Sequence, residues 1–361
     1  MALFIGIVGL PNVGKSTLFN VLTGGHAPAS NYPFCTVDPN VGMVVVPDPR
    51  LASLEAMLKP QSCTPTAIEF VDIAGLVRGA SQGEGLGNRF LSHVRQADAL
   101  VHVLRCFADP QISHVEGSIA PLRDLEVVEA ELMLADLETI EKALSRLDKV
   151  VRTDPQSPQR LEFEVLQRVA AVLQRGAPRW SPALAHEELE VIRSHNLLTA
   201  KPVLYIGNVG EQGEGREQLE QLASAVGPNQ VLAIAVKLEA ELAQLEPAER
   251  REFQVAMEVE ETGIERLTLA GYQLLDLITF YTMANGKLQA WQLPRGATAL
   301  KAAGRIHSDM ERGFIRAEVA AALEVIGAGS LAKLRDEGRL RTEGRDYVVQ
   351  DGDVVHFLFR S

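Results

Sequence analysis

Cysteine and long apolar runs are both scarce in this chain. The three cysteines, Cys35, Cys63 and Cys106, are odd in number and show no paired spacing, which argues against a disulfide framework and a cysteine-based zinc site. No stretch approaches the roughly 18 uninterrupted apolar residues of a membrane span. The apolar start at 2–10 has no basic residue ahead of it and no small-residue cleavage site after it, so we interpret it as a strand rather than a signal peptide. We therefore expect a soluble, cytoplasmic protein with no membrane partner.

Basic charge is also in short supply. Lys and Arg number 35 against 47 Asp and Glu, and the formal net charge of -12 argues against nucleic-acid binding by the whole surface. Residues 278–361 nevertheless carry 12 basic and 10 acidic side chains, so their net charge is +2 and that of residues 1–277 is -14. An RNA partner would therefore need a local patch, for which an ordinary solvated face is the alternative. The candidate residues are Lys301, Arg305, Arg312 and Arg316 with His307.

Length and hydrophobic patterning predict the architecture. At roughly 150 residues per domain, 361 residues allow two to three domains. Apolar runs bounded by turn residues alternate with helix-like periodicity, which predicts an α/β fold with a mostly parallel, doubly wound sheet. The predicted strands are Ala2–Val8, Val41–Val46, Ala67–Val71, Ala99–Leu104, Val203–Ile206 and Val231–Val236.

One connection between these strands is too long for a crossover helix. The 96 residues between Arg105 and Pro202 contain helix-like apolar stripes on both sides of the breaker Asp154–Pro158. We interpret residues 121–198 as a helical hairpin inserted into the α/β domain. A protruding two-helix arm is the interpretation we favour, and a hairpin that merely packs on the sheet is the alternative.

The sequence changes character after residue 277. Glycines punctuate short apolar segments there, which predicts a small α+β domain over 278–361. We expect strands at Leu288–Leu293 and Asp346–Phe359, and helices at Ala317–Ile326 and Leu331–Glu337.

A nucleotide phosphate loop lies directly after the first predicted strand. The segment Gly9-Leu10-Pro11-Asn12-Val13-Gly14-Lys15-Ser16-Thr17 has the spacing of this motif, and helix-like sequence follows it. Backbone N–H groups of the loop, from Asn12 to Thr17, are expected to cradle the phosphates. Lys15 would supply a cation to the β and γ groups, and Ser16 a hydroxyl to Mg²⁺. Asn12 either coordinates a monovalent cation such as K⁺ or makes a hydrogen bond within the loop.

Two further segments complete the predicted phosphate and metal site. Asp72 stands at the end of the third predicted strand in Asp72-Ile73-Ala74-Gly75, where it would hold Mg²⁺ through water while Gly75 offers its backbone N–H to the γ-phosphate. Thr36 is the candidate hydroxyl that closes onto Mg²⁺, and a turn or capping role is its alternative. The glycine-rich sequence after Gly75 suits a switch.

The base-recognition segment departs from that of GTPases. Those enzymes usually present Asn-Lys-x-Asp after a late strand, whereas here Asn208-Val209-Gly210-Glu211 follows the strand. The carboxylate is one methylene longer and the lysine is replaced by Val209, so we expect guanine selectivity to be lost. Asn208 is predicted to offer a donor and an acceptor to adenine, and a backbone amide at Ala235 would support the base.

These motifs together resemble the YchF / Obg-like ATPase family of P-loop proteins. The resemblance spans essentially the whole chain and rests on the motifs at 9–17, 32–36, 70–81, 83–91, 302–309 and 313–318. It implies a Ras-like nucleotide domain over 1–120 and 199–277, a coiled-coil insertion over 121–198 and a C-terminal TGS domain of ubiquitin-like (β-grasp) fold over 278–361. It also implies preference for ATP, redox regulation and a role at the ribosome, where we expect a monomer to contact the large subunit and its RNA. Cys35 lies beside Thr36, so its oxidation would place a polar group against the segment that closes onto Mg²⁺, and a small buried hydrophobic side chain is the alternative.

The hydrolytic chemistry is predicted to be slow. Leu76 follows Asp-x-x-Gly where related enzymes place the Gln that orients the attacking water. The family resemblance aligns His114 with a candidate for that task, and a surface histidine is the alternative. Two function classes stay open: an Mg²⁺-dependent ATPase that uses ATP and ADP states to regulate ribosome association, and a nucleotide-stabilised ribosome-binding adaptor with incidental hydrolysis. A GTPase is a further alternative.

Overall fold

A computed structural model describes residues 3–24, 40–73, 86–154, 156–177, 185–256 and 261–360. Of these residues, 3–24, 40–42 and 69–264 form one compact unit, and 43–68 and 265–360 form a second. None of the helices in the described part of the chain combines the length and apolar character that crossing a membrane requires.

The first unit is organised by a mostly parallel sheet with the strand order β2-β4-β1-β5-β6-β7. The strands are β1 Phe4–Val8, β2 Val41–Val45, β4 Ala67–Asp72, β5 Ala99–Arg105, β6 Val203–Asn208 and β7 Val231–Ile234. They confirm the six predicted strands, and β1 pairs in parallel with both β4 and β5. Every residue of β5 is buried, as expected for a central strand that is covered on both faces.

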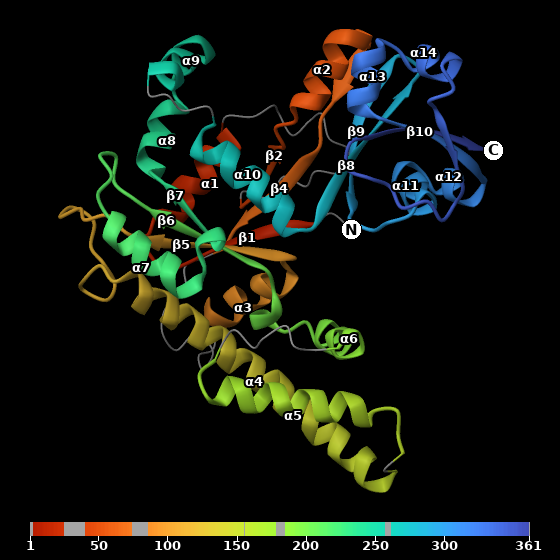
Figure 1. Ribbon diagram of the computed structural model, residues 1–361. Coiled ribbons are helices and arrows are strands. Elements are labelled where there is room, and N and C mark those ends of the chain that lie inside the picture. Colours follow the sequence, from red (N-terminus) through yellow and green to blue (C-terminus); the bar gives the residue numbers. More distant parts are fainter. Residues whose placement is uncertain are drawn as a thin grey trace. The chain divides into compact units, whose positions relative to one another are not determined.

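Helices follow the strands as the alternating pattern predicts (Figure 1). α1 begins at Lys15, directly after the phosphate loop, and its buried face carries Leu18, Phe19 and Leu22. The other helices of the first unit outside the insertion are α3 Leu86–Gln96, α7 Arg216–Val226, α8 Val236–Leu242 and α9 Pro247–Ala256, with the 3-10 turn η3 at Pro228–Gln230. The helix α10 Gly263–Leu274 begins at the end of this unit and belongs mostly to the second.

The predicted insertion contains two long helices. α4 spans Pro121–Thr153 and α5 spans Arg160–Gln174, followed by α6 His186–Ser194 and the 3-10 turn η2 Leu198–Ala200. With 33 residues, α4 is about 50 Å long. It begins with Pro121 at a position where proline loses no helical hydrogen bond.

The two halves of α4 have different neighbours. In the first half, Leu125 packs with Leu104 and Tyr205 of the sheet and with Leu222 of α7. In the second half, the core is made with α5 and α6 and includes Ile140, Leu147, Val165, Val169 and Ile192. Figure 1 shows this second half and α5 running beyond the sheet of the first unit. The sequence left two alternatives for the insertion, packing on the sheet or extension as an arm. The first half of α4 packs on the sheet, and the second half extends as an arm.

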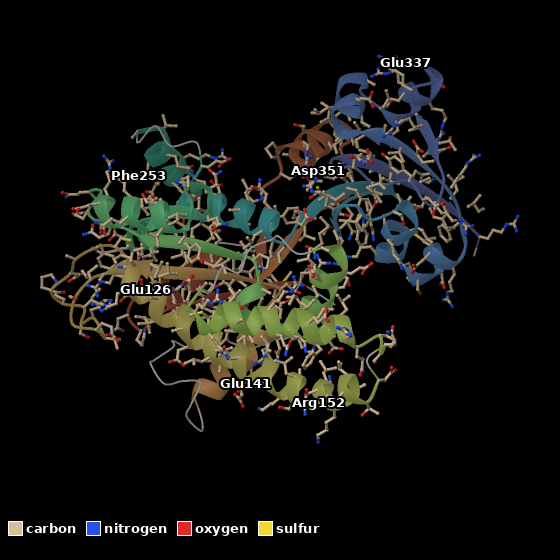
Figure 2. All side chains as sticks on the ribbon, turned by 60° about the horizontal axis from the view of Figure 1, so that its bottom comes forward. Glu126, Glu141, Arg152, Phe253, Glu337 and Asp351 are labelled. Carbon is tan, nitrogen blue, oxygen red and sulfur yellow. The ribbon has the colours of Figure 1, made fainter. Side chains whose placement is uncertain are left out.

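The exposed face of α4 is charged along its length. Glu126, Glu141 and Arg152 are solvent-exposed side chains near the start, the middle and the end of the helix (Figure 2). Ion pairs four residues apart join Lys142 to Glu138 and Arg152 to Asp148. Such exposed pairs add little stability, so packing against the sheet and against α5 holds the helix.

The second unit contains a sheet with the order β11-β10-β12-β8-β9-β3. Its strands are β3 Ser62–Thr64, β8 Leu277–Ala284, β9 Lys287–Pro294, β10 Phe314–Ala321, β11 Arg341–Glu343 and β12 Asp353–Phe359, and its helices are α2 Pro49–Leu58, α11 Ala299–Ile306, α12 Ser308–Arg312, α13 Ala322–Ala328 and α14 Leu331–Asp336. The strand expected at 288–293 and the helix expected at 331–337 are confirmed.

Two local predictions for this unit were wrong. The helix expected over 317–326 is half strand, because β10 runs to Ala321 and only then does α13 begin. Ala317 and Val319 are fully buried while Arg316 is exposed and Glu318 half-buried, so pairing in the sheet overrides the helical propensity of alanine. The strand expected over 346–359 begins only at Asp353, since residues 346–352 form a turn and a loop.

A segment from the N-terminal half of the chain belongs to the second unit. α2 buries Leu51 and Leu54 against Tyr281 of β8 and Val325 of α13. β3 pairs in parallel with β9, and the Arg50 guanidinium binds Asp351 at 2.7 Å. The C-terminal domain predicted to start at residue 278 is therefore extended in the structure by residues 265–277 and 43–68.

Candidate nucleotide site

The loop between β1 and α1 has a backbone conformation that requires glycine at two positions. Gly9 has φ 147° and Gly14 has φ 104°. A Cβ atom at Gly9 would lie 2.5 Å from the carbonyl oxygen of Val103, and one at Gly14 would lie 2.5 Å from Nδ2 of Asn208. These close approaches and the left-handed φ values exclude larger side chains. The loop thus has the compact form of an anion-binding turn at the start of a helix.

Lys15 is the charged group within this loop. Only 7% of the residue is exposed, and its Nζ donates to the carbonyl oxygen of Leu10 at 2.7 Å. Burial lowers the pKa of Lys15 to about 8, and the nearby Asp72 carboxylate acts in the opposite direction. A phosphate group at the loop would restore the preference for the charged form, because an adjacent anion raises a lysine pKa.

Ser16 and Asp72 meet as the spacing predicts. The Ser16 hydroxyl donates to Oδ2 of Asp72 at 2.7 Å. The other oxygen, Oδ1, is buried and has no hydrogen-bond partner among the described residues. A hydroxyl and an unsatisfied carboxylate oxygen at one place fit the oxygen donors that Mg²⁺ prefers, with water and phosphate completing its coordination. No cluster of three or more His, Cys, Asp or Glu residues suited to a metal occurs in the described ranges.

Several predicted residues lie outside the described residues. They are Cys35 and Thr36 in the segment 25–39, and Gly75 and Leu76 in the segment 74–85. Their roles in metal closure, γ-phosphate contact and redox regulation stay predictions. Of the other two cysteines, Cys63 has a pKa raised to about 11 and Cys106 one raised to about 12, in both cases chiefly by burial.

Asn208 joins the phosphate loop to the end of the sheet. Its Nδ2 donates to the carbonyl oxygen of Val13 at 2.9 Å, and its Oδ1 accepts from the backbone N–H of Val236 at 3.2 Å. Only 4% of the residue is exposed. The amide therefore positions the loop in this structure, and the predicted contact with adenine would have to use the second Nδ2 hydrogen and the second lone pair of Oδ1.

Glu211 carries an ion pair that the sequence analysis missed. Its Oε1 lies 2.7 Å from Nζ of Lys237, two residues after Ala235, and this hydrogen bond raises the pKa of Lys237. Val209 is held by its N–H, which donates to the carbonyl oxygen of Ile234 at 3.1 Å. The structure thus brings Val209, Glu211 and the 235–237 segment together at the ends of β6 and β7. Opposite charges after neighbouring strands were the available signal.

A loop at 106–120 borders the phosphate loop. Arg105 is 1% exposed, and its guanidinium donates to the carbonyl oxygens of Phe107, Asp109 and Ile112 at 3.0–3.2 Å. Nδ2 of Asn12 donates to the carbonyl oxygen of Ser113 at 3.3 Å. Asn12 thus makes a hydrogen bond from the phosphate loop to the 106–120 loop, and coordination of a monovalent cation by Asn12 stays a prediction.

His114 is buried in this loop. Its Nε2 lies 2.8 Å from Oδ2 of Asp124 in the first turn of α4, and 5% of its side chain is exposed. Its Nδ1 accepts from the backbone N–H of Glu116 at 3.1 Å. His114 is thus neither a surface histidine nor, in this arrangement, a side chain with a nitrogen available to water.

The glycine-constrained loop, the buried lysine and the Ser16–Asp72 pair on a parallel sheet define a P-loop nucleotide-binding protein. A family model described as "50S ribosome-binding GTPase" matches residues 4–141. A second, named for the C-terminal part of YchF GTPases and described as "Protein of unknown function (DUF933)", matches residues 277–360.

The relatives match along the full length. "Ribosome-binding ATPase YchF" of Bacillus subtilis is 46% identical over 99% of this chain and 100% of the relative. The protein of the same name from Haemophilus influenzae is 46% identical over 98% of both chains. The solved structure of the Schizosaccharomyces pombe YchF GTPase superposes with a TM-score of 0.88 at 34% identity, over 99% of this chain and 97% of that one. The chain therefore belongs to the YchF family, and the predicted family and fold class are confirmed.

Proposed function

We propose that this protein is a slow, Mg²⁺-dependent ATP hydrolase whose nucleotide state regulates its association with the ribosome. The observation that carries the proposal is the Ser16–Asp72 pair with its unsatisfied Oδ1, set beside Lys15 in a phosphate loop. The relatives are named ribosome-binding ATPases, and these names support the ribosome as the partner and ATP as the nucleotide.

The phosphate chemistry follows from the residues present. Backbone N–H groups from Asn12 to Thr17 would bind the β- and γ-phosphates, and Lys15 would turn from the Leu10 carbonyl to neutralise them. Mg²⁺, when bound, would neutralise charge that develops on the phosphates. Ser16 and Asp72 would hold it, with Thr36 closing from the 25–39 segment and Gly75 contacting the γ-phosphate. Lys15→Ala should abolish hydrolysis, because the loop then lacks its charge.

Preference for ATP over GTP is proposed from the base-side residues. Guanine reading in GTPases requires a carboxylate that accepts from two guanine donors. Here that carboxylate belongs to Glu211, which is one methylene longer and already pairs with Lys237 at 2.7 Å. Competition from Lys237 and the changed reach weaken guanine binding. Titration of ATP and GTP with Mg²⁺ tests this, and a severalfold preference for GTP would favour the GTPase alternative instead.

Contact with the ribosome is proposed for the α4–α5 hairpin and for the basic residues of the second unit. These basic residues differ in their ion pairs. Lys301 pairs with Glu311 and Arg312 with Asp309, whereas Arg316 is exposed at the start of β10. Contacts to RNA phosphates release counterions, so affinity should fall with salt. In a plot of log affinity against log salt concentration, each phosphate neutralised should steepen the slope by roughly one unit. Arg316 is therefore expected to contribute more to the slope than Lys301 or Arg312.

Co-sedimentation with ribosomes across a salt series, with ATP, with ADP and without nucleotide, tests this part. A nucleotide-dependent affinity supports the regulated ATPase. Equal affinity in the three states favours an adaptor in which hydrolysis is incidental. Replacing Lys301, Arg305, Arg312 and Arg316 by Ala should reduce the salt slope without changing ATP affinity, and unaltered binding would identify an ordinary solvated face. Large-subunit and rRNA contact, action as a monomer and any K⁺ dependence belong to the same proposal.

A further inference from the structure

Both ring nitrogens of His114 are engaged within the protein. Nδ1 accepts from the N–H of Glu116 at 3.1 Å, so the proton of the neutral ring must reside on Nε2. Nε2 lies 2.8 Å from Oδ2 of Asp124 and therefore donates to that carboxylate. A ring held in this way has no nitrogen left to orient a water molecule.

Asp124 is a firm partner for the ring. Its side chain is fully buried, and its second oxygen, Oδ1, accepts from Nε and Nη2 of Arg123 at 3.2 and 2.9 Å. Arg123 also donates to the Ser118 hydroxyl at 2.8 Å. Charge-assisted bonds of this kind are stronger than neutral ones, and removal of a partner from a buried carboxylate is costly. His114 is thus held by α4 through a network that keeps one orientation.

The same loop is attached to the phosphate loop. Ser113, the residue before His114, accepts from the side chain of Asn12 at 3.3 Å. Arg105 fixes the intervening backbone through three carbonyl oxygens. Residues 106–120 therefore connect the phosphate loop, at Asn12, with the first turn of the hairpin helix α4, at Asp124.

We propose that Asp124 is a positioning residue that restrains His114 and thereby keeps basal hydrolysis slow. The proposal rests on the proposed function, together with the role in orienting the attacking water that the family resemblance implies for His114. His114 becomes competent only when its bond to Asp124 breaks, and a displacement of α4 relative to the 106–120 loop would break it. The hairpin and the phosphate loop are thereby coupled through the His114–Asp124 pair, which the contact of Arg123 with Ser118 accompanies.

Asp124→Asn is the variant that tests this restraint. The asparagine keeps the volume but has one acceptor oxygen, which cannot serve both Arg123 and the His114 ring. We expect kcat for ATP to rise about tenfold, the order that loss of one charge-assisted hydrogen bond allows, with KM unchanged. The rise should vanish in the His114→Ala background, and Asp124→Glu should restore slow turnover. Asp276→Asn, on an exposed ion pair with Arg295 in the second unit, is the matched control and should leave turnover unchanged.

An unchanged or lower kcat in Asp124→Asn overturns the proposal, as does a rise that persists without His114. If the variant fails to fold, the ring ¹⁵N spectrum of His114 in the wild-type chain decides. An Nε2–H bond that persists with a non-hydrolysable ATP analogue and Mg²⁺, the state of slow basal turnover, supports the restraint, and loss of that bond on adding the analogue alone overturns it. ATP hydrolysis that requires Lys15 but is unchanged by substitution of Asp124 would contradict the restraint alone. Absence of ATP hydrolysis would contradict the proposed function.

Discussion

Truncation of Leu54 should destabilise the C-terminal unit, although the residue lies far from it in sequence. Leu54 is fully buried in α2 and packs in one core with Tyr281, Val325 and Leu334. A leucine-to-alanine change in such a core costs about 2–5 kcal/mol, because it removes transfer free energy and leaves a cavity. That loss is a large fraction of the stability of an ordinary domain.

Two measurements test this: denaturant unfolding, which gives the free energy of unfolding, and native-state hydrogen exchange of the β8 and β12 amides. Leu54→Ala should lower the free energy of unfolding of the second unit by about 2–5 kcal/mol and accelerate exchange there. Leu323→Ala is the matched control, since Leu323 lies on α13 of the same unit and is 72% exposed. A Leu54→Ala effect as small as that of the control would refute the assignment of residues 43–68 to this unit. Full stability of an isolated 277–360 fragment would refute it too.

Three further outcomes are expected. ATP affinity should not change with pH through Lys15 below pH 8, where the side chain is already charged, and should fall as pH rises above 8. The lowered pKa of about 8 means that ATP binding above this pH requires Lys15 to take up a proton. Calorimetry in buffers of different ionisation enthalpy measures the proton uptake, and its absence at pH 9 would contradict the prediction. The double substitution Val209→Lys with Glu211→Asp should move selectivity toward GTP in nucleotide titrations, and unchanged selectivity would show that other residues read the base. Asp136→Ala should destabilise the first unit by about 2–4 kcal/mol in chemical unfolding, because the buried carboxylate accepts from two backbone N–H groups and one hydroxyl, and a cost below about 0.5 kcal/mol would mean that water replaces those bonds.

The phosphate site was predictable because its residues are fixed by short-range spacing. Lys15 and Ser16 follow the buried strand β1 after the short loop 9–14, and Asp72 ends the neighbouring strand β4, so parallel pairing of β1 with β4 brings them together. The same reasoning predicted every strand of the first sheet. Periodicity over a long segment likewise predicted the two helices of the insertion, since it changes little when one residue is misjudged.

What sequence reasoning missed depends on contacts between distant residues. The pairing of Ser62–Thr64 with β9 leaves no local mark, so the contribution of residues 43–68 to the second unit was invisible. Alanine-rich β10 was mistaken for helix because its pairing with β12, and not its propensity, decides its conformation. The His114–Asp124 bond likewise joins a loop to a helix across a fold that spacing alone does not specify.

Steady-state hydrolysis of ATP by the purified full-length chain, in parallel with its Lys15→Ala variant and with Mg²⁺ removed by chelation, tests the central claim most directly. The account predicts slow turnover of ATP that exceeds that of GTP and disappears both in the variant and without Mg²⁺. Turnover that survives either the loss of Lys15 or the removal of Mg²⁺ would contradict the assignment of Lys15, Ser16 and Asp72 as the phosphate and metal site.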